Sequence, residues 1–209
     1  MFTGIVSSIG TITRVEPQSQ AGEQAGVRVR IQTRDFPLQQ AKLGDSIAVQ
    51  GACMTAVELG SDYFVIDISR ESLNRTTGLD VLGEVNLEHS LRLGDSLDGH
   101  LVSGHVDGVG RVVHFAPVGE SWDLRIDAPL SLAPYLAYKG SVAVNGVSLT
   151  VNKVEDHADG CVFYINLIPH TVQVTTLKHL KAGSPVNLEI DMIARYVDRM
   201  AKFQQKETN

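Results

Sequence analysis

Three groups of side chains in this sequence have the chemistry of an active site, and the first is a cysteine. Cys53 lies in the run Gly51 to Thr55, and a similar run later in the chain has Ser148 in its place. A thiol becomes a base or a nucleophile when its pKa falls below the ordinary value of about 8.5. A small cysteine in a strand more often serves packing alone, so both interpretations stay open here.

The second group lies in the polar stretch from Asp95 to Gly108, which contains His100, His105 and Asp107. Residues five apart on an extended chain point to opposite faces, so the two histidines do not readily converge on a metal ion. The stretch offers no third histidine, and a zinc site is therefore not expected. His105 is a candidate for proton transfer near neutral pH, although a lone histidine more often serves only as a hydrogen-bonding residue.

The third group consists of two turns of the form Gly-x-[Cys/Ser]-[Met/Leu]-Thr, at residues 51–55 and 146–150. Glycine lets a ligand approach the backbone closely, and the hydroxyl and amide groups can bind the edge of a flat heterocycle. Duplication alone explains why the turns are alike, but it does not explain their hydroxyl-rich content. No GxGxxG run lies between a strand and a helix, so a dinucleotide site is not indicated.

The elements that position these groups repeat with a period of about 95 to 100 residues. Residues 46–55 align with residues 141–150, and five of these ten pairs are identical. Further matched runs are 3–6 with 103–106, 75–77 with 174–176, and 85–88 with 186–189. Each copy has the size of a small domain, which predicts domains at 1–97 and 98–190 and a C-terminal segment at 191–209.

Within each copy the hydrophobic pattern is that of strands. Val27, Val29 and Ile31 alternate with polar residues, the period-two pattern of a half-buried strand. About six short strands per copy, separated by recurring glycines, predict an all-β chain of two small closed barrels. The stretches 36–42 and 130–138 are expected to form short helices at equivalent places.

The C-terminal segment follows a helical period instead. Ile193, Tyr196, Val197 and Met200 follow i, i+3, i+4, i+7 spacing, and Phe203 extends this apolar stripe. A helix of this length is marginal alone in water, so the stripe is expected to bury against a barrel or against other copies of the chain. The pattern does not decide between these two.

Composition excludes several classes of protein. The net charge is −6 and the basic residues are scattered, so no nucleic-acid partner is expected. No apolar run reaches the roughly 18 residues of a membrane span, and the first residues lack the charged and apolar regions of a signal peptide. Two cysteines outside any CxxC pair fit a reducing compartment, and we expect a cytoplasmic protein.

Several runs, in this order, resemble the riboflavin synthase family of the alpha type along nearly the whole chain. They are Met1 to Val6, Gly51 to Thr55, Gly99 to Gly108, Asn145 to Val151, Ile168 to Thr171 and Ile193 to Val197. The resemblance implies a homotrimer in which each subunit has two six-stranded Greek-key barrels and a C-terminal helix that joins subunits. It places the active site between the first barrel of one subunit and the second barrel of a neighbour.

The resemblance also implies which residues bind the two lumazine molecules. The first barrel would use Gly4, Ile5, Val6, Cys53, Met54, Thr55, Asp67, Ile68, Ser69, Arg70, Glu71 and Ser72. The second barrel would use Gly104, His105, Val106, Lys139, Ser148, Leu149, Thr150, Asn166, Leu167, Ile168, Pro169, His170 and Thr171. The two sets are superposed by the internal repeat.

The implied reaction joins two 6,7-dimethyl-8-ribityllumazine molecules to give riboflavin and a ribitylaminopyrimidinedione. The lumazine ring is its own electron sink, so neither an organic cofactor nor a metal is expected. We assign His105 and Thr150 to proton transfer at the donor, and Cys53, Ser46 and Lys139 to the acceptor. Beyond its substrate and its own copies, lumazine synthase is a further candidate partner.

Two departures and three competing functions accompany this resemblance. Asn145 stands where many relatives have Asp, and Ser72 replaces a more usual Thr while keeping the hydroxyl. The main competitor is a non-catalytic lumazine- or flavin-binding paralogue, which is disfavoured because the motifs of both copies are intact. A flavin-binding oxidoreductase barrel would need a nicotinamide domain, and an oligonucleotide-binding barrel would need basic charge and exposed aromatic rows.

Overall fold

The first half of the chain forms a closed β-barrel. Its short strands alternate buried and exposed side chains, so one face of each strand lines the core. The computed structural model describes residues 1–18 and 25–207. Neighbouring strands hydrogen-bond in the order β1-β2-β5-β4-β3-β6 and close on themselves, which leaves no free edge. Their bounds are β1 Ser8–Pro17, β2 Val27–Gln32, β3 Ser46–Val49, β4 Ala52–Leu59, β5 Tyr63–Ile68 and β6 Gly83–His89.

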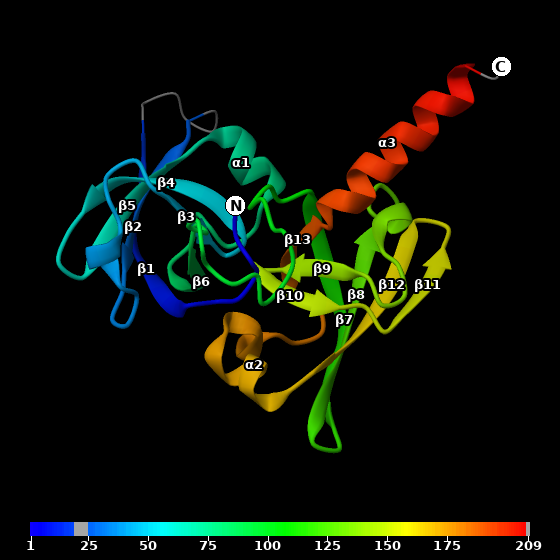
Figure 1. Ribbon diagram of the computed structural model, residues 1–209. Helices are drawn as coiled ribbons and strands as arrows, with labels where there is room; N and C mark the ends of the chain where they lie inside the picture. Colours follow the sequence, from blue (N-terminus) through cyan, green and yellow to red (C-terminus); the bar gives the residue numbers. More distant parts are fainter. Residues whose placement is uncertain (19–24, 208–209) are drawn as a thin grey trace.

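The second half repeats this arrangement as a sheet in the order β10-β9-β13-β7-β8-β12-β11 (Figure 1). The bounds are β7 Gly108–Val118, β8 Ser121–Pro129, β9 Ser141–Val144, β10 Val147–Thr150, β11 Lys153–His157, β12 Gly160–Leu167 and β13 Pro185–Ile190. Strands β10 and β11 together occupy the place of β4. The break between them falls at the repeat position where β4 has its own register shift, between Ala56 and Glu58. The predicted all-β fold of two six-strand units is confirmed.

Short helices connect the strands. Helix α1 (Arg70–Arg75) follows β5, and helix α2 (Pro169–Val174) follows β12 at the equivalent position. The hydroxyl of Ser69 caps α1 by accepting a hydrogen bond from the Ser72 amide. The helices expected at 36–42 and 130–138 are single 3-10 turns, η2 (Leu38–Gln40) and η3 (Ala133–Tyr135), and a further 3-10 turn, η4, spans Thr176–His179.

The two units meet along an approximate two-fold axis between Phe2 and Val102. These residues form an antiparallel bridge in which each amide donates to the other's carbonyl, at 2.7 and 3.1 Å. The Phe2 side chain is fully buried, and it packs with Ala48 and Ala143 in a small core of its own between the larger cores of the two units. The boundary predicted near Leu97 falls in the connection from β6 to β7.

Two buried asparagines join the units around this axis. The Asn187 side chain donates to the carbonyls of Gln50 and Thr77 and accepts from the Thr77 amide at 2.7 Å. Asn86 makes the matching contacts in the other direction, with the Asn145 carbonyl and the Thr176 amide. The matched 75–77 and 174–176 segments therefore each reach across to the opposite unit.

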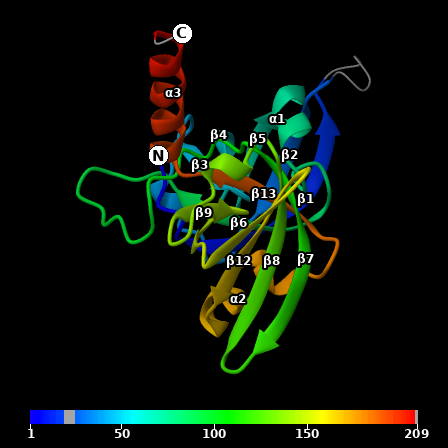
Figure 2. The ribbon, with the colours of Figure 1, turned by 90° about the vertical axis from the view of Figure 1, so that its right-hand side faces the viewer.

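Helix α3 (Met192–Glu207) leaves the second unit and projects away from both sheets (Figures 1 and 2). Its polar side faces its own unit, where the Tyr135 hydroxyl donates to Asp198 at 2.9 Å. Its apolar stripe of Ile193, Tyr196, Val197, Met200 and Phe203 points to solvent, with each side chain more than half exposed. Residues 208–209 of the predicted C-terminal segment lie outside the described residues. No helix in the described ranges is long and apolar enough to cross a membrane.

We predict that Asn187→Ala lowers the free energy of unfolding by about 2–4 kcal/mol, because it removes three hydrogen bonds and leaves buried backbone groups unpaired. Urea denaturation followed by intrinsic fluorescence measures the change. Asn74→Ala on the exposed side of α1 is the matched control. Equal stabilities of the two variants would contradict the role given to Asn187.

Candidate active site

The segment at the start of each unit reaches across to the Gly-x-[Cys/Ser] turn of the other unit. The Ser148 amide on β10 donates to the Gly4 carbonyl at 2.8 Å, and the Cys53 amide on β4 donates to the Gly104 carbonyl at 2.7 Å. Val6 accordingly packs against the core of the second unit and Val106 against the core of the first. The two Gly-x-[Cys/Ser] turns are thus each completed by a segment from the opposite half.

Glycine is required where these segments cross. Gly104 has a φ of +77°, and a Cβ placed there would lie 2.7 Å from the Cβ of Cys53. Gly4 has the same φ, and its added Cβ would lie 2.6 Å from the Cβ of Ser148. Left-handed backbone and contacts this short both exclude a side chain, so the backbone lies directly against Cys53 and Ser148.

Two buried glutamates hold the crossing segments. Glu189 accepts hydrogen bonds from the amides of Ser103 and Gly104 at 2.6 and 2.9 Å. Glu88 accepts from the Thr3 amide, the Thr3 hydroxyl and the Gly4 amide at 2.6, 2.7 and 3.0 Å. Burial raises the pKa of both carboxyls, and the donated hydrogen bonds oppose that rise.

Cys53 and His105 meet in one surface hollow of about 180 Å³, although they come from different halves of the chain. The hollow is lined by Ala52, Cys53, Met54, Glu71, Ser72, Arg75, Thr76, Gly104, His105 and Val106. It combines a thiol, an imidazole and a hydroxyl beside bare backbone. That set can bind the polar edge of a flat ring and move protons at it.

The structure bears on how the predicted site residues are grouped. The family resemblance grouped Gly104, His105 and Val106 with the second barrel and residues 4–6 with the first, whereas each of these segments packs on the opposite unit. The physical reason is the exchange of segments around the Phe2–Val102 bridge. Residues 3–6 align with residues 103–106 in the repeat. The alignment therefore does not show whether a segment covers its own unit or the other one.

His105 and Cys53 also face a larger hollow of about 600 Å³, walled by helix α3. Its lining is Met1, Cys53, Ser103, His105, Val106, Asp107, Met192, Arg195 and Tyr196. The first turns of α3 therefore lie beside Cys53 and His105. Helix α3 therefore forms one wall of this hollow and also presents its apolar stripe to solvent.

In the second unit a buried histidine contacts Ser148, the half-buried residue at the position matching Cys53. His100 Nδ1 lies 2.6 Å from the Ser148 hydroxyl, while His100 Nε2 is buried and, within the described residues, has no hydrogen-bond partner. Burial lowers the pKa of His100 and so favours its neutral form. Sequence reasoning considered His100 only as a metal ligand. Its contact with Ser148 joins residues 48 positions apart, so no local sequence pattern indicates it.

The other predicted residues of the strand pairs lie beside these turns. Ser46 on β3 is paired with Thr55 on β4, and Thr150 on β10 is paired with Ser141 on β9. Lys139 has a φ of +64°, and its ammonium group donates to the Asn152 side chain at 3.1 Å. Leu149 is buried in the second core.

The predicted binding residues at the ends of β5 and β12 lie partly on the surface and partly in the cores. Ile68 and Leu167 are buried in the two cores, so their side chains do not reach a surface hollow. Asn166 donates to the Ser121 hydroxyl at 2.8 Å, and the Arg70 guanidinium binds the Ala25 carbonyl. The remaining residues, Ser69, Glu71, Ser72, Ile168, Pro169, His170 and Thr171, belong to the caps and first turns of α1 and α2.

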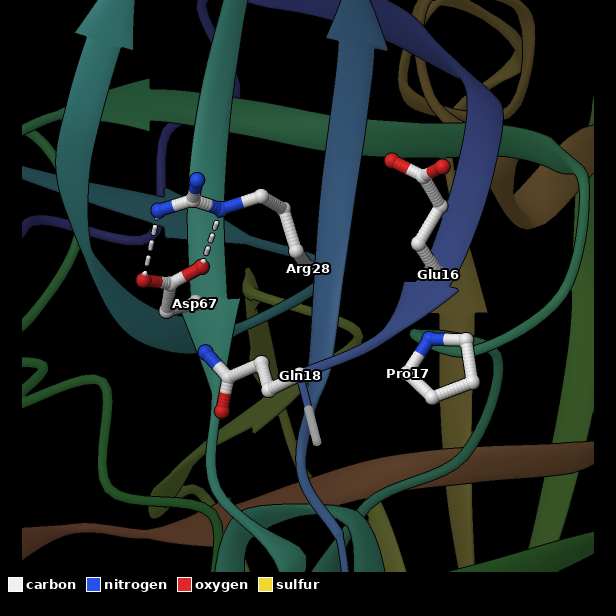
Figure 3. Close-up of a pocket in the computed structure, with 5 residues that line it drawn as sticks. All are labelled: Glu16, Pro17, Gln18, Arg28 and Asp67. Carbon is white, nitrogen blue, oxygen red and sulfur yellow. Dashed lines mark hydrogen bonds and ion pairs between the residues drawn. The ribbon is translucent and has the colours of Figure 1, made fainter. Parts of the chain in front are cut away.

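Asp67 faces a separate open hollow on the outer wall of the first barrel, of about 510 Å³, with Glu16, Pro17 and Gln18 (Figure 3). Arg28 binds both of its carboxylate oxygens at 2.8 and 3.0 Å. This guanidinium lowers the pKa of Asp67. The equivalent pair in the second unit is Asn166 and Asp123, so the two units differ in charge here.

In the described part of the chain, no three His, Cys, Asp or Glu side chains lie close enough together to hold a metal ion.

The chain consists of two β units of the same design, and the Gly-x-[Cys/Ser] turn of each unit is covered by a segment of the other. This arrangement defines a duplicated protein with two sites suited to a flat ring. The Lumazine binding domain family matches residues 3–90 and again residues 103–191.

Comparison with curated proteins narrows this class. The chain is 43% identical over 212 residues to riboflavin synthase of Brucella abortus (strain 2308), covering 98% of this chain and all of that one. It is 40% identical to riboflavin synthase of Photobacterium phosphoreum (99% of this chain, 92% of that one) and 36% identical to that of Bacillus subtilis (strain 168) (95% and 89%). The chain belongs to the riboflavin synthase family.

Solved structures share the fold. LumP complexed with 6,7-dimethyl-8-(1'-D-ribityl) lumazine has a TM-score of 0.76 at 28% identity, covering 90% of this chain and 98% of that one. LumP complexed with riboflavin has a TM-score of 0.78 at 28% identity, covering 91% and 99%.

We predict that His100 makes stability depend on pH. Its pKa is lowered in the folded state, so the unfolded chain takes up the proton first as pH falls. The contribution of neutral His100 is complete above pH about 6.5 and is lost as pH falls toward the lower folded-state pKa, by at most about 1.4 kcal/mol per pH unit. His100→Gln removes this dependence. Burial also lowers the pKa of His89, and urea unfolding of both proteins from pH 8 to 5 separates the two contributions, because the variant keeps His89. A constant difference between the two proteins would contradict the prediction.

Proposed function

We propose that this chain is a riboflavin synthase, which converts two molecules of 6,7-dimethyl-8-ribityllumazine into riboflavin and 5-amino-6-ribitylamino-2,4-pyrimidinedione. The observation that carries the proposal is the pair of intact lumazine-binding units, each with its Gly-x-[Cys/Ser] turn covered by a segment of the other. Two sites of the same overall design suit a reaction that consumes two identical molecules. The products together contain every atom of the substrates, so no oxidant is consumed.

The protein's contribution is position and proton transfer. The C7 methyl of the donor lumazine is acidic because the ring delocalises the resulting carbanion. The site must place the two rings face to face, which removes the entropy cost of bringing two bound molecules together. A four-carbon unit then passes from the donor ring to the acceptor ring.

The family resemblance divides these residues between the two lumazines, with His105 and Thr150 in proton transfer at the donor and Cys53, Ser46 and Lys139 at the acceptor. We keep His105 and Thr150 in proton transfer and Ser46 and Lys139 as polar contacts, but we place Cys53 at the same ring as His105, where it activates that ring. His105 and Cys53 line one hollow, which supports their acting on the same lumazine. Ser148, held by His100, occupies the matching position of the second unit. The two sites are therefore unequal, as donor and acceptor roles require.

Assembly into a homotrimer is part of this proposal. The stripe from Ile193 to Phe203 is exposed on the side of α3 that faces away from its own unit, and water-exposed apolar stripes of this kind mark protein interfaces. A second copy of the helix is its natural partner. A cytoplasmic location stays a prediction from the composition, and association with lumazine synthase stays a prediction from the family resemblance.

A non-catalytic lumazine binder is the second candidate, because the LumP structures share this fold. Incubation of the purified chain with 6,7-dimethyl-8-ribityllumazine alone separates the two functions. A synthase produces riboflavin continuously without added cofactor, whereas a binder retains unconverted lumazine. Absence of riboflavin would contradict the proposed function.

We predict that His105→Gln lowers kcat by about 10²-fold, the lower end of the usual range for a positioned acid or base. Cys53→Ser keeps a hydrogen-bonding group but replaces the more nucleophilic sulfur by oxygen, and it is expected to slow turnover as well. Steady-state riboflavin formation measures both. His157→Gln, on the outer edge of the second unit, is the matched control. Turnover near that of the unmodified protein in both variants would remove these residues from the mechanism.

We predict that Met200→Asp breaks the assembly, because it places a charge in the middle of the apolar stripe. Light scattering is expected to show a trimer for the unmodified chain and smaller species for the variant, with loss of riboflavin formation. Lys202→Gln, outside the apolar stripe and ion-paired with Asp198 on the same helix, is the control. A trimer that survives Met200→Asp would exclude the stripe as the joining surface.

A further inference from the structure

A bidentate ion pair ties helix α3 to the segment that carries His105. Arg195 Nη1 and Nη2 donate to the two carboxylate oxygens of Asp107 at 2.8 and 3.0 Å. The Asp107 carboxylate also accepts the Ile190 amide at 2.9 Å, and its own amide donates to the Leu188 carbonyl at 2.8 Å. Paired hydrogen bonds between a planar guanidinium and a carboxylate fix direction as well as distance.

This ion pair anchors the chain on one side of His105, and Glu189 anchors it on the other. Glu189 binds the amides of Ser103 and Gly104, directly before the histidine. Asp107 follows His105 by two residues, and its side chain is only 12% exposed. His105 therefore sits on a short segment whose two ends are both fixed.

The other half of the repeat provides an internal comparison. There Glu88 binds the amides of Thr3 and Gly4, and the Ser7 amide donates to the Leu87 carbonyl at 2.8 Å, as Asp107 does to Leu188. The repeat alignment places Ser7 opposite Asp107, and a serine cannot form the ion pair, so this half lacks its counterpart. It also has Ile5 in place of His105. The ion pair is therefore found in the half of the repeat that has the histidine and is missing from the half that has isoleucine.

We propose that Arg195 is a positioning residue for the reaction: through Asp107 it holds the His105 segment in place and links that segment to helix α3. The inference rests on the proposed function of the site. Arg195 and His105 line the same 600 Å³ hollow, with Tyr196 of the apolar stripe beside them. The helix that offers the joining surface is in this way coupled to the residue that transfers the proton.

The test measures riboflavin formation by Arg195→Ala, Arg195→Lys, Asp107→Asn and the double variant Arg195→Ala/Asp107→Asn. Asparagine at 107 keeps an acceptor for the Ile190 amide and loses only the ion pair. Arg199→Ala removes the same charge one turn further along α3 and is the matched control. Light scattering on each protein reports the assembly, so that turnover is compared per assembled enzyme.

The expected result is a fall in kcat of at least tenfold for Arg195→Ala with KM changed less than threefold, and partial recovery in Arg195→Lys. The double variant is expected to be no slower than the slower single variant, because both changes break one interaction. Turnover per assembled enzyme within twofold of the unmodified protein for Arg195→Ala, or multiplying effects in the double variant, would overturn the inference. An inactive unmodified chain would instead contradict the proposed function.

Discussion

The structure depends on the exchange of two short segments around the bridge between Phe2 and Val102. The strand that carries Cys53 is covered by Gly104 from the other half, and the strand that carries Ser148 is covered by Gly4. Neither turn is completed by its own unit. The buried glutamates, the left-handed glycines and the crossing asparagines all serve to hold this exchange in place.

The exchange explains how a duplicated chain obtains two sites that are alike in shape and different in chemistry. Each site takes its strand from one copy of the repeat and its covering segment from the other. Within one copy, a substitution on the strand changes one site and a substitution in the covering segment changes the other. Cys53 lines a hollow together with His105. Ser148 instead lies against the segment that contains Ile5, and its hydroxyl contacts His100. One fold thus provides unequal surroundings for two identical molecules.

Much of this architecture could be predicted from the sequence, because period-two alternation, recurring glycines and the internal repeat are local signals. The helical period of residues 193–203 likewise predicted α3 and its stripe. Three features could not be predicted in this way. The repeat superposes Gly4 on Gly104 and so cannot tell which unit each segment covers. The contact of His100 with Ser148 joins residues that share no local pattern, and α1 and α2 are too short to show a helical period.

The most direct measurement is a crystal structure of this chain with 6,7-dimethyl-8-ribityllumazine or a non-reacting analogue bound. We expect the ring in the first unit to contact Cys53 together with His105 of the same chain, with the Gly104 carbonyl within hydrogen-bonding distance of the Cys53 amide. A ring held between Cys53 and Ile5, with Gly4 in the place of Gly104, would contradict the exchange of segments and with it the account of both sites.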